Sequence, residues 1–252
     1  MVEDPFETAF DAHSNEYRSR WDLDPSARQQ RARVVSAVLA TTSPGHRILD
    51  LGCGTGTDAA ALARADRRVC GVDLSTGMLA QAERHTEGLP VELAQADLRE
   101  PSTLPEGPFD AALSNFGVLN CIEISPLGAA LADRLRPGAP FAAIWMSRWC
   151  LPEVASLIVR GHIRTAITRR SGTAQVADQQ LPMGFPSHRA VARALQPHFE
   201  LQTTQALGWA MPAPGSKTRR SLEFLGRIDR RLAYWPVIRS LGDHTLALFR
   251  RR

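Results

Sequence analysis

This sequence of 252 residues lacks the features that mark membrane-spanning, secreted and metal-binding chains. No apolar run approaches the roughly 20 residues that a helix needs to cross a bilayer. The opening stretch MVEDPFETAFDAHSNEY is acidic and polar and carries no signal-peptide pattern, so we expect a cytoplasmic protein. Cys53, Cys70, Cys121 and Cys150 form no C-x-x-C pair, and their spacing suits neither a zinc site nor a disulfide framework. We therefore expect buried free thiols and no metal.

Lysine is nearly absent: Lys217 is the only lysine of the sequence. Arginine therefore supplies almost all of the positive charge. The chain has 30 basic and 26 acidic residues, and much of the excess lies late in the sequence. A mild basic bias of this kind can signal nucleic-acid binding, but arginine on solvated helix faces explains it equally well. No appended RNA-binding module is visible, so we do not expect a nucleic-acid partner.

The rest of the composition is that of an ordinary globular protein, with 44% apolar and 22% charged residues. There is no internal repeat and no long low-complexity linker. We expect residues 1–252 to form a single domain. Within it, residues 1–45 would form N-terminal helices, 46–146 a cofactor-binding core, and 147–252 lid insertions with the last two strands.

Hydrophobic periodicity predicts helices and strands in alternation through the first 146 residues. Two helices come first, near 5–20 and 25–42. After them, β-type runs alternate with further helical stretches, as in a parallel sheet with helices on both faces. The expected strands are 47–51, 68–73, 91–96, 109–114 and 140–146, and the helices between them are 57–65, 75–85 and 125–138.

The last hundred residues interrupt this alternation. Helical patterns cover 152–170, 187–197 and an arginine-rich segment, 216–240. Two further strands are expected at 199–211 and 244–251. Together these patterns predict an α/β fold with a doubly wound, seven-stranded, mostly parallel sheet and two helical insertions that could cover a site as lids.

A glycine-rich loop follows the first expected strand in the stretch ILDLGCGTGTDAAALA. In open α/β sheets, ligands bind at the carboxyl ends of the strands, and glycine there permits unusual backbone angles and removes the Cβ that would block a ligand. Asp73 ends the second strand, where a carboxylate can accept two hydrogen bonds from a ribose diol. Asp97 ends the third strand and is placed to accept a proton from an adenine amino group. We therefore predict an adenosine-shaped site.

The segments ILDLGCGTG, VCGVDLSTGML, AQADL and FDAALSNFGVLN, followed by RLRPG, closely resemble the successive motifs of class I S-adenosylmethionine-dependent methyltransferases. The resemblance covers about residues 47–146, in the expected order and spacing. The N-terminal stretch FDAHSNEY is also similar to the opening helix of the small-molecule members. The resemblance implies a Rossmann-like fold, S-adenosylmethionine as cofactor, and methyl transfer as the activity.

The resemblance also implies donor-binding residues. Those around the methionine part and sulfonium would be Asp50, Gly52, Gly54 and Gly56, with Ser114 and Asn115 near the departing methyl group. Those around the adenosine would be Asp73, Leu74, Met78, Asp97 and Leu98, and Tyr17 would close over the cofactor. Structural roles compete with several of these, such as core packing for Met78 and capping for Asp50, Asp97 or Asn115.

Methyl transfer is an in-line displacement from an activated donor, so alignment and desolvation can supply most of the acceleration. A general base is needed only for a protonated nucleophile. A structural or surface role is favoured for each of His13, His162, His188 and His244, so no catalytic residue is assigned. For the acceptor we expect contacts from Phe116, Asn120 and Trp149, within a wider set comprising Trp145, Met183, Phe185, Trp209 and Met211.

Other classes of protein share parts of this pattern. Nicotinamide-dependent dehydrogenases usually carry G-x-G-x-x-G, whereas this loop is G-x-G-x-G. Enzymes that methylate exocyclic base amines usually carry N/D-P-P-Y/F where this chain has SNFG. A non-enzymatic adaptor would have no need of the intact glycines, Asp73 and Asp97. We expect the acceptor to be a small organic molecule, a biosynthetic intermediate, and family frequency slightly favours oxygen as the methylated atom. The alternative is an RNA or protein acceptor. We expect the protein to be a monomer or a homodimer.

Overall fold

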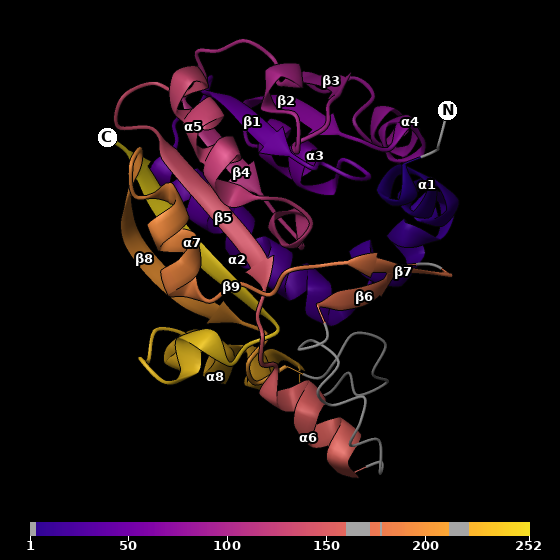
Figure 1. The fold of residues 1–252 in the computed structure, drawn as a ribbon, viewed down its shortest axis with the longest axis vertical. Coiled ribbons are helices and arrows are strands. Elements are labelled where there is room, and N and C mark those ends of the chain that lie inside the picture. The colour runs from indigo at the N-terminus through magenta and orange to yellow at the C-terminus, as the bar shows by residue number, and fades with distance from the viewer. Residues whose placement is uncertain (1–3, 160–171, 177, 212–221) are drawn as a thin grey trace.

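The computed structural model describes residues 4–159, 172–176, 178–211 and 222–252 (Figure 1). A seven-stranded sheet with the order β3-β2-β1-β4-β5-β9-β8 runs through the molecule, and β9 is antiparallel to both of its neighbours. The other neighbouring strands pair in parallel, which confirms the prediction of a mostly parallel sheet. The strands are β1 (Arg47–Leu51), β2 (Arg68–Asp73), β3 (Val91–Gln95), β4 (Ala111–Ser114), β5 (Pro140–Met146), β8 (Phe199–Leu207) and β9 (His244–Arg251).

Helices cover both faces of the sheet. The side chains of Asp4, Asp24 and Ser75 cap α1, α2 and α4 by accepting hydrogen bonds from backbone N–H groups of the first turn. The helices are α1 (Pro5–Tyr17), α2 (Pro25–Thr41), α3 (Thr57–Ala63), α4 (Thr76–His85), α5 (Ile124–Arg134), α6 (Leu151–Val159), α7 (His188–Leu195) and α8 (Leu222–Leu232). Single turns of other helix types are Arg18–Asp22, Pro101–Thr103, Val118–Asn120 and Ile238–Ser240.

The period of two along each strand divides the core between the two faces. On β1, Leu49 and Leu51 face the layer formed by α5 and α7, whereas Ile48 faces the layer formed by α2 and α3. All three side chains are fully buried. This packing fixes the carboxyl end of β1, and therefore the start of the glycine loop, in the middle of the sheet.

The structure departs from the expected elements mainly in the insertions. β8 ends at Leu207 rather than at residue 211, because Gly208 takes a left-handed backbone conformation with φ +71°. β4 begins at Ala111, and Phe109 forms only an isolated bridge to Leu135. A hairpin of β6 (Thr173–Val176) and β7 (Gln179–Pro182) was not predicted.

Two predicted helical stretches extend beyond what the structure describes. The helix expected at 152–170 is seen as α6, Leu151–Val159, and residues 160–170, including the candidate His162, lie outside the described residues. The segment expected at 216–240 contains α8, and its part before residue 222 lies outside them as well. Within the part of the chain that the structure describes, no helix is long and apolar enough to cross a membrane.

Candidate active site

A cavity lies at the carboxyl ends of β1, β2 and β4 and is walled on one side by α1. It encloses about 970 Å³, counting the part that is open to solvent. Most of the residues expected to bind a cofactor line it, namely Tyr17, Gly52, Gly54, Asp73, Leu74, Met78, Asp97, Leu98 and Asn115. Asp50, Gly56 and Ser114 do not line it, although they lie on or next to the same strand ends.

The glycine loop brings backbone to the cavity wall without side chains. Gly52 has φ +70°, and a Cβ there would lie 2.2 Å from Cγ2 of Val118, so no other residue fits. Gly54 has φ +53°, and a Cβ there would meet no atom within 4 Å, because it would project into open space. The position at Gly54 is therefore a bare surface on which a ligand can lie.

Asp73 presents its carboxylate at the end of β2. Its Oδ2 accepts the N–H of Gly54 at 2.8 Å, and its Oδ1 accepts the N–H of Ser75 at 3.0 Å. Burial raises the pKa of this carboxyl, and the hydrogen bonds from Ser75 and Gly54 partly oppose that rise. The carboxylate is fixed in position, and its remaining lone pairs can accept hydrogen bonds from ligand hydroxyls.

An arginine that the sequence analysis did not single out lies at the centre of a buried ionic network. Arg31 of α2 donates to Oδ2 of Asp58 at 2.5 Å and to Oδ1 of Asp22 at 2.9 Å. Asn115 donates to the same oxygen of Asp58 at 2.8 Å. Asp22 in turn accepts the hydroxyl of Thr55 at 2.5 Å. The network joins α2, α3, the glycine loop and the end of β4.

Three polar atoms of this region are buried and have no hydrogen-bond partner: Nε of Arg31, Oδ1 of Asp58 and Oδ2 of Asp50. Burial raises the pKa of Asp50 and of Asp58, and the charge of Asp58 raises that of Asp50 further. Buried polar atoms in native proteins are normally paired. Arg31 and Asp58 line the cavity, where an α-amino acid could pair with them, its carboxylate with the arginine and its ammonium with the aspartate, so these two residues fit the methionine part of S-adenosylmethionine.

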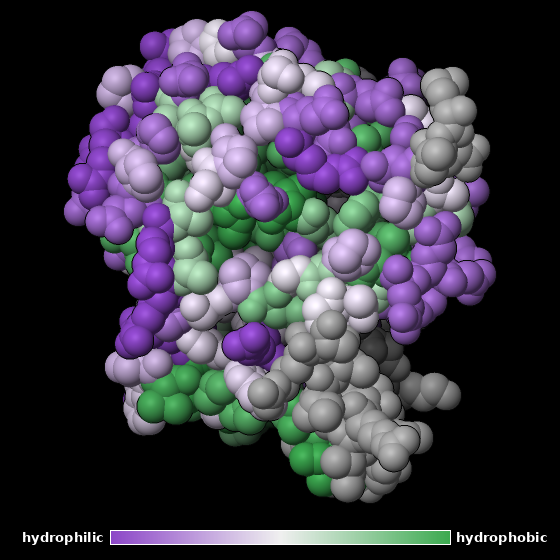
Figure 2. All heavy atoms as spheres, viewed as in Figure 1, coloured by the Kyte–Doolittle hydropathy of each residue, from purple (hydrophilic) through white to green (hydrophobic). Residues whose placement is uncertain are grey.

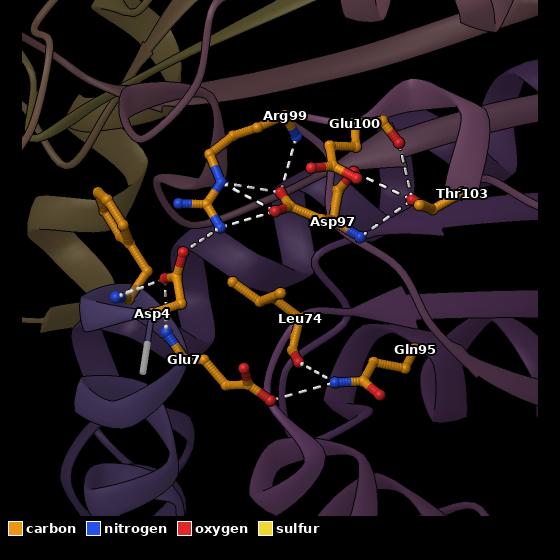
Figure 3. A network of polar contacts seen from close by, with 9 residues as sticks. Asp4, Glu7, Leu74, Gln95, Asp97, Arg99, Glu100 and Thr103 are labelled. Atoms are coloured by element: carbon orange, nitrogen blue, oxygen red, sulfur yellow. Dashed lines mark hydrogen bonds and ion pairs between the residues drawn. The ribbon is translucent and has the colours of Figure 1, made fainter. Parts of the chain in front are cut away.

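At the far end of the cavity, Asp97 forms an ion pair with Arg99 (Figure 3). Nη2 of Arg99 lies 2.7 Å from Oδ2 of Asp97 and 2.6 Å from Oδ2 of Asp4, so it bridges the end of β3 and the cap of α1. Although burial opposes it, the hydrogen bond from Arg99 holds the pKa of Asp97 below its usual range. Gln95 also donates to Glu7 of α1 at 3.1 Å.

The contacts of α1 continue along its length. Asp11 accepts the N–H of Gly77 at 2.8 Å and the hydroxyl of Ser75, and Asn15 accepts the side-chain amide of Gln81 at 2.7 Å. Residues 4, 7, 11 and 15 recur at helical spacing, so one polar stripe of α1 is bonded to β3, α4 and the turns beside them. Phe6, Phe10 and Tyr17 of the same helix line the cavity. The polar stripe holds this apolar wall in place.

The residues expected to contact an acceptor divide into two groups. Phe116 lines the cavity with a strained φ of +51°, and its ring lies 4.5 Å from the Arg31 guanidinium and 5.1 Å from the ring of the buried His244. Met183 also lines the cavity. Asn120 does not, because its side chain bonds the backbone of Met146 and Gly184.

The remaining candidates do not line the cavity. Trp145 is buried in the core, and its indole N–H donates to the carbonyl of Pro186 at 3.1 Å. Trp149 is 36% exposed, and Phe185, Trp209 and Met211 are likewise absent from the cavity wall. Among the described residues there is no cluster of histidine, cysteine, aspartate and glutamate that could hold a metal ion.

Comparison with known proteins agrees with this geometry. Residues 48–138 match the family described as a methyltransferase domain. This part of the chain is a class I S-adenosylmethionine-dependent methyltransferase domain. It contains the glycine loop, Asp73 and Asp97, whereas Arg31 and all of α1 precede it. The methyltransferase domain therefore supplies the strand ends, and the preceding helices supply the wall of the cavity.

Curated relatives match this chain over only part of their length. The chain is 36% identical over 114 residues to demethylmenaquinone methyltransferase of Beutenbergia cavernae, covering 44% of each chain. It is 34% identical over 156 residues to the enzyme of that name from Clavibacter sepedonicus, covering 61% of each. The chain thus spans about half the length of these curated relatives.

Solved structures share the fold across nearly the whole chain. One is the putative methyltransferase in complex with the Trm112 methyltransferase activator of Haloferax volcanii, with a TM-score of 0.63, 17% identity and 99% of each chain covered. Another is the N-methyltransferase NodS of Bradyrhizobium japonicum in complex with S-adenosyl-L-homocysteine, with a TM-score of 0.60, 15% identity, and 98% and 99% covered. At these identities the likeness shows the fold alone.

Proposed function

We propose that this chain transfers a methyl group from S-adenosylmethionine to a small organic acceptor. The observation that carries the proposal is the polarity of the cavity, which has unpartnered Arg31 and Asp58 atoms at one end and the Asp73 carboxylate further along. These groups are complementary to an amino acid and a ribose joined in one molecule. The methyltransferase relatives named for quinone and malonyl-acyl-carrier-protein substrates support a small-molecule acceptor.

The donor would lie along the strand ends. Arg31 and Asp58 would hold its carboxylate and ammonium, and Asp73 would accept the ribose hydroxyls. Asp97 would accept the adenine amino group, with the base between apolar side chains. The residues we assign to the donor are those expected from the sequence, Tyr17, Asp50, Gly52, Gly54, Gly56, Asp73, Leu74, Met78, Asp97, Leu98, Ser114 and Asn115, with Arg31 and Asp58 added.

When bound, the donor supplies a methyl group on positively charged sulfur, and the work of the chain is to align and desolvate it. The cavity wall beside the end of β4 is apolar, with Phe116, Val118 and Met183 there and Phe10 on α1. Such a wall excludes water from a displacement and suits an acceptor with a large apolar part. Our preference for oxygen over nitrogen or carbon rests on family frequency and on no residue of this chain.

The proposal treats residues 1–252 as one domain acting in the cytoplasm. Its test is to incubate methyl-labelled S-adenosylmethionine with the pure protein and a lysate of the source cells, and then to separate small metabolites from RNA and protein. The expected result is label in the small-molecule fraction, reduced with the Asp73→Ala variant. Label in RNA or protein would overturn the acceptor class, and failure of the pure protein to bind the donor would overturn the activity itself.

A further inference from the structure

A run of four exposed residues follows α8. Tyr234, Trp235 and Val237 are 57%, 59% and 74% exposed, and Pro236 between them is exposed too. Soluble proteins rarely expose several large apolar residues in succession without a binding role. This run is therefore the first place to look for a docking surface.

The exposed run is held firmly from both sides. The N–H of Trp235 donates to the carbonyl of Leu232 at 3.0 Å, and the carbonyl of Trp235 accepts the N–H of Arg239 at 2.9 Å. Ala233 and Ile238, which flank the run, are buried at 0% and 8% exposure. The apolar side chains therefore point outward from an anchored turn.

The outer face of α8 extends this surface. Gly226 and Asp229 are buried against the rest of the molecule, so residues on the opposite side of the helix face solvent. Phe224 on that side is 64% exposed and lies at helical spacing from Arg227 and Arg231, which are also exposed. Figure 2 shows apolar surface over α8 at the lower end of the molecule.

The charge of this region is positive. Arg227, Arg230 and Arg231 are exposed on α8, where the exposed acid is Glu223. Asp229, the other acid of the helix, is buried and forms an ion pair with Arg33 of α2. The exposed part of the helix therefore carries more positive than negative charge beside its aromatic residues.

The first insertion contributes apolar surface at the same end. The N–H of Leu151 in α6 donates to the carbonyl of Leu241, just beyond the exposed turn, at 3.1 Å. Leu151 is 41% exposed, and Ile158 at the other end of α6 is 52% exposed. Figure 1 shows α6 and α8 together below the end of the sheet. Both insertions thus place apolar side chains on one end of the molecule.

We propose that this end of the molecule docks on an anionic lipid bilayer. The docking surface consists of Phe224, Arg227, Arg231, Tyr234, Trp235 and Val237. Tryptophan and tyrosine favour the headgroup level of a membrane, a valine at the tip of a turn can enter the acyl boundary, and arginine is attracted by anionic headgroups. The proposal commits to a bilayer because aromatic residues and positive charge are interleaved, and it is independent of the methyl-transfer activity.

The test is sedimentation of the full chain with vesicles of phosphatidylcholine alone and of phosphatidylcholine with phosphatidylserine at about 7:3. We expect binding to the anionic vesicles, weakened by salt, with a blue shift of tryptophan fluorescence. The double variants Trp235→Ser/Val237→Ser and Arg227→Gln/Arg231→Gln should each lower the partition coefficient about tenfold.

Matched controls are Leu201→Ser, which removes an exposed leucine from β8, and Arg64→Gln/Arg84→Gln, which removes two exposed charges elsewhere. Both should bind like the wild type, and circular dichroism melting should show all variants folded. Absence of binding to either vesicle, or equal binding by the surface variants, would overturn the proposal. Capture of an acidic protein without vesicle binding would overturn it in favour of a protein partner.

Discussion

Asp11 of α1 binds the first turn of α4, because its Oδ1 accepts the N–H of Gly77 at 2.8 Å. The two helices can approach this closely only because residue 77 has no side chain. A Cβ there would lie 3.0 Å from both Oδ1 of Asp11 and Oγ of Ser14, and 3.3 Å from the Asp11 Cα. The position of the cavity wall formed by α1 therefore depends on a glycine in another helix.

The variant Gly77→Ala should weaken donor binding about 3- to 10-fold, because α1 must move away from α4 and takes its wall of the cavity with it. Thermal stability should change little, since alanine favours a helix over glycine by about 1 kcal/mol and offsets the lost contact. Calorimetric titration with S-adenosylhomocysteine measures the effect, and Ala80→Ser on the exposed face of α4 is the control. Unchanged affinity would show that the contact between Asp11 and Gly77 does not set the position of the cavity wall.

The variant Asp73→Ala should weaken donor binding by about 1–3 kcal/mol, because ligand hydroxyls lose a charged acceptor. Equilibrium binding to the folded protein should be measured, since the N–H groups of Gly54 and Ser75 also lose their partner. Glu92→Ala, which removes an exposed carboxylate from the neighbouring strand β3, should leave the affinity unchanged. An equal effect of both variants would refute the ribose assignment.

Much of this architecture could be predicted because it is local. β1 and β2 are short apolar runs, the first followed by Gly52 and the second ended by Asp73, and both signals lie within a few residues. Arg31 and Asp58 could not be found in this way, since their pairing depends on how α2 packs against α3. The sequence does not predict the β6–β7 hairpin, because TAQV and QQLP have only four residues each and are too short for an apolar pattern to stand out. Such features depend on packing between segments that are far apart in the sequence, and residue spacing along the chain does not reveal that packing.

Asp97 shows the same limit within a predicted site. Its place at the end of β3 follows from the motif and its ion pair with Arg99 is local, but the bridge from Arg99 to Asp4 depends on α1 crossing the strand ends. Asn120 and Trp149 show the converse, because residue type made them acceptor candidates whereas the structure keeps them off the cavity wall. Residue type narrows the set of candidate site residues, and tertiary contacts decide which of them line the cavity.

Alkaline titration should distinguish Tyr17 from the other tyrosine of the chain. Burial, partly opposed by the charge of Arg31, raises the pKa of Tyr17 from 10 to about 12. Because the folded state holds this proton more tightly than the unfolded state, the stability it contributes is complete below pH 10 and is lost as the pH rises toward 12. Phenolate absorbance at high pH should show a late step that Tyr17→Phe removes. A step near pH 10 in its place would show that the half-buried Tyr17 phenol is not desolvated.

The ion pair between Arg33 and Asp229 should contribute strongly to stability, since it fastens α8 to α2 with both side chains largely buried. Asp229→Asn leaves a buried guanidinium without a counter-charge and should lower the free energy of unfolding by about 3 kcal/mol in urea titration. Adding Arg33→Met should restore part of the loss, because the unpaired charge is then gone. A single-variant loss below about 1 kcal/mol would show that the pair is not structurally important.

The position of β9 in the sheet also affects the order in which the molecule can be assembled. This strand pairs with β5 on one side and β8 on the other, and in the described sheet β8 has β9 as its single neighbour. During synthesis, Phe199–Leu207 therefore leaves the ribosome with no strand to join until His244–Arg251 has followed it. Over that interval β8 presents unpaired backbone N–H and C=O groups beside the apolar side chains of Phe199 and Leu207, a combination that favours aggregation of a nascent chain.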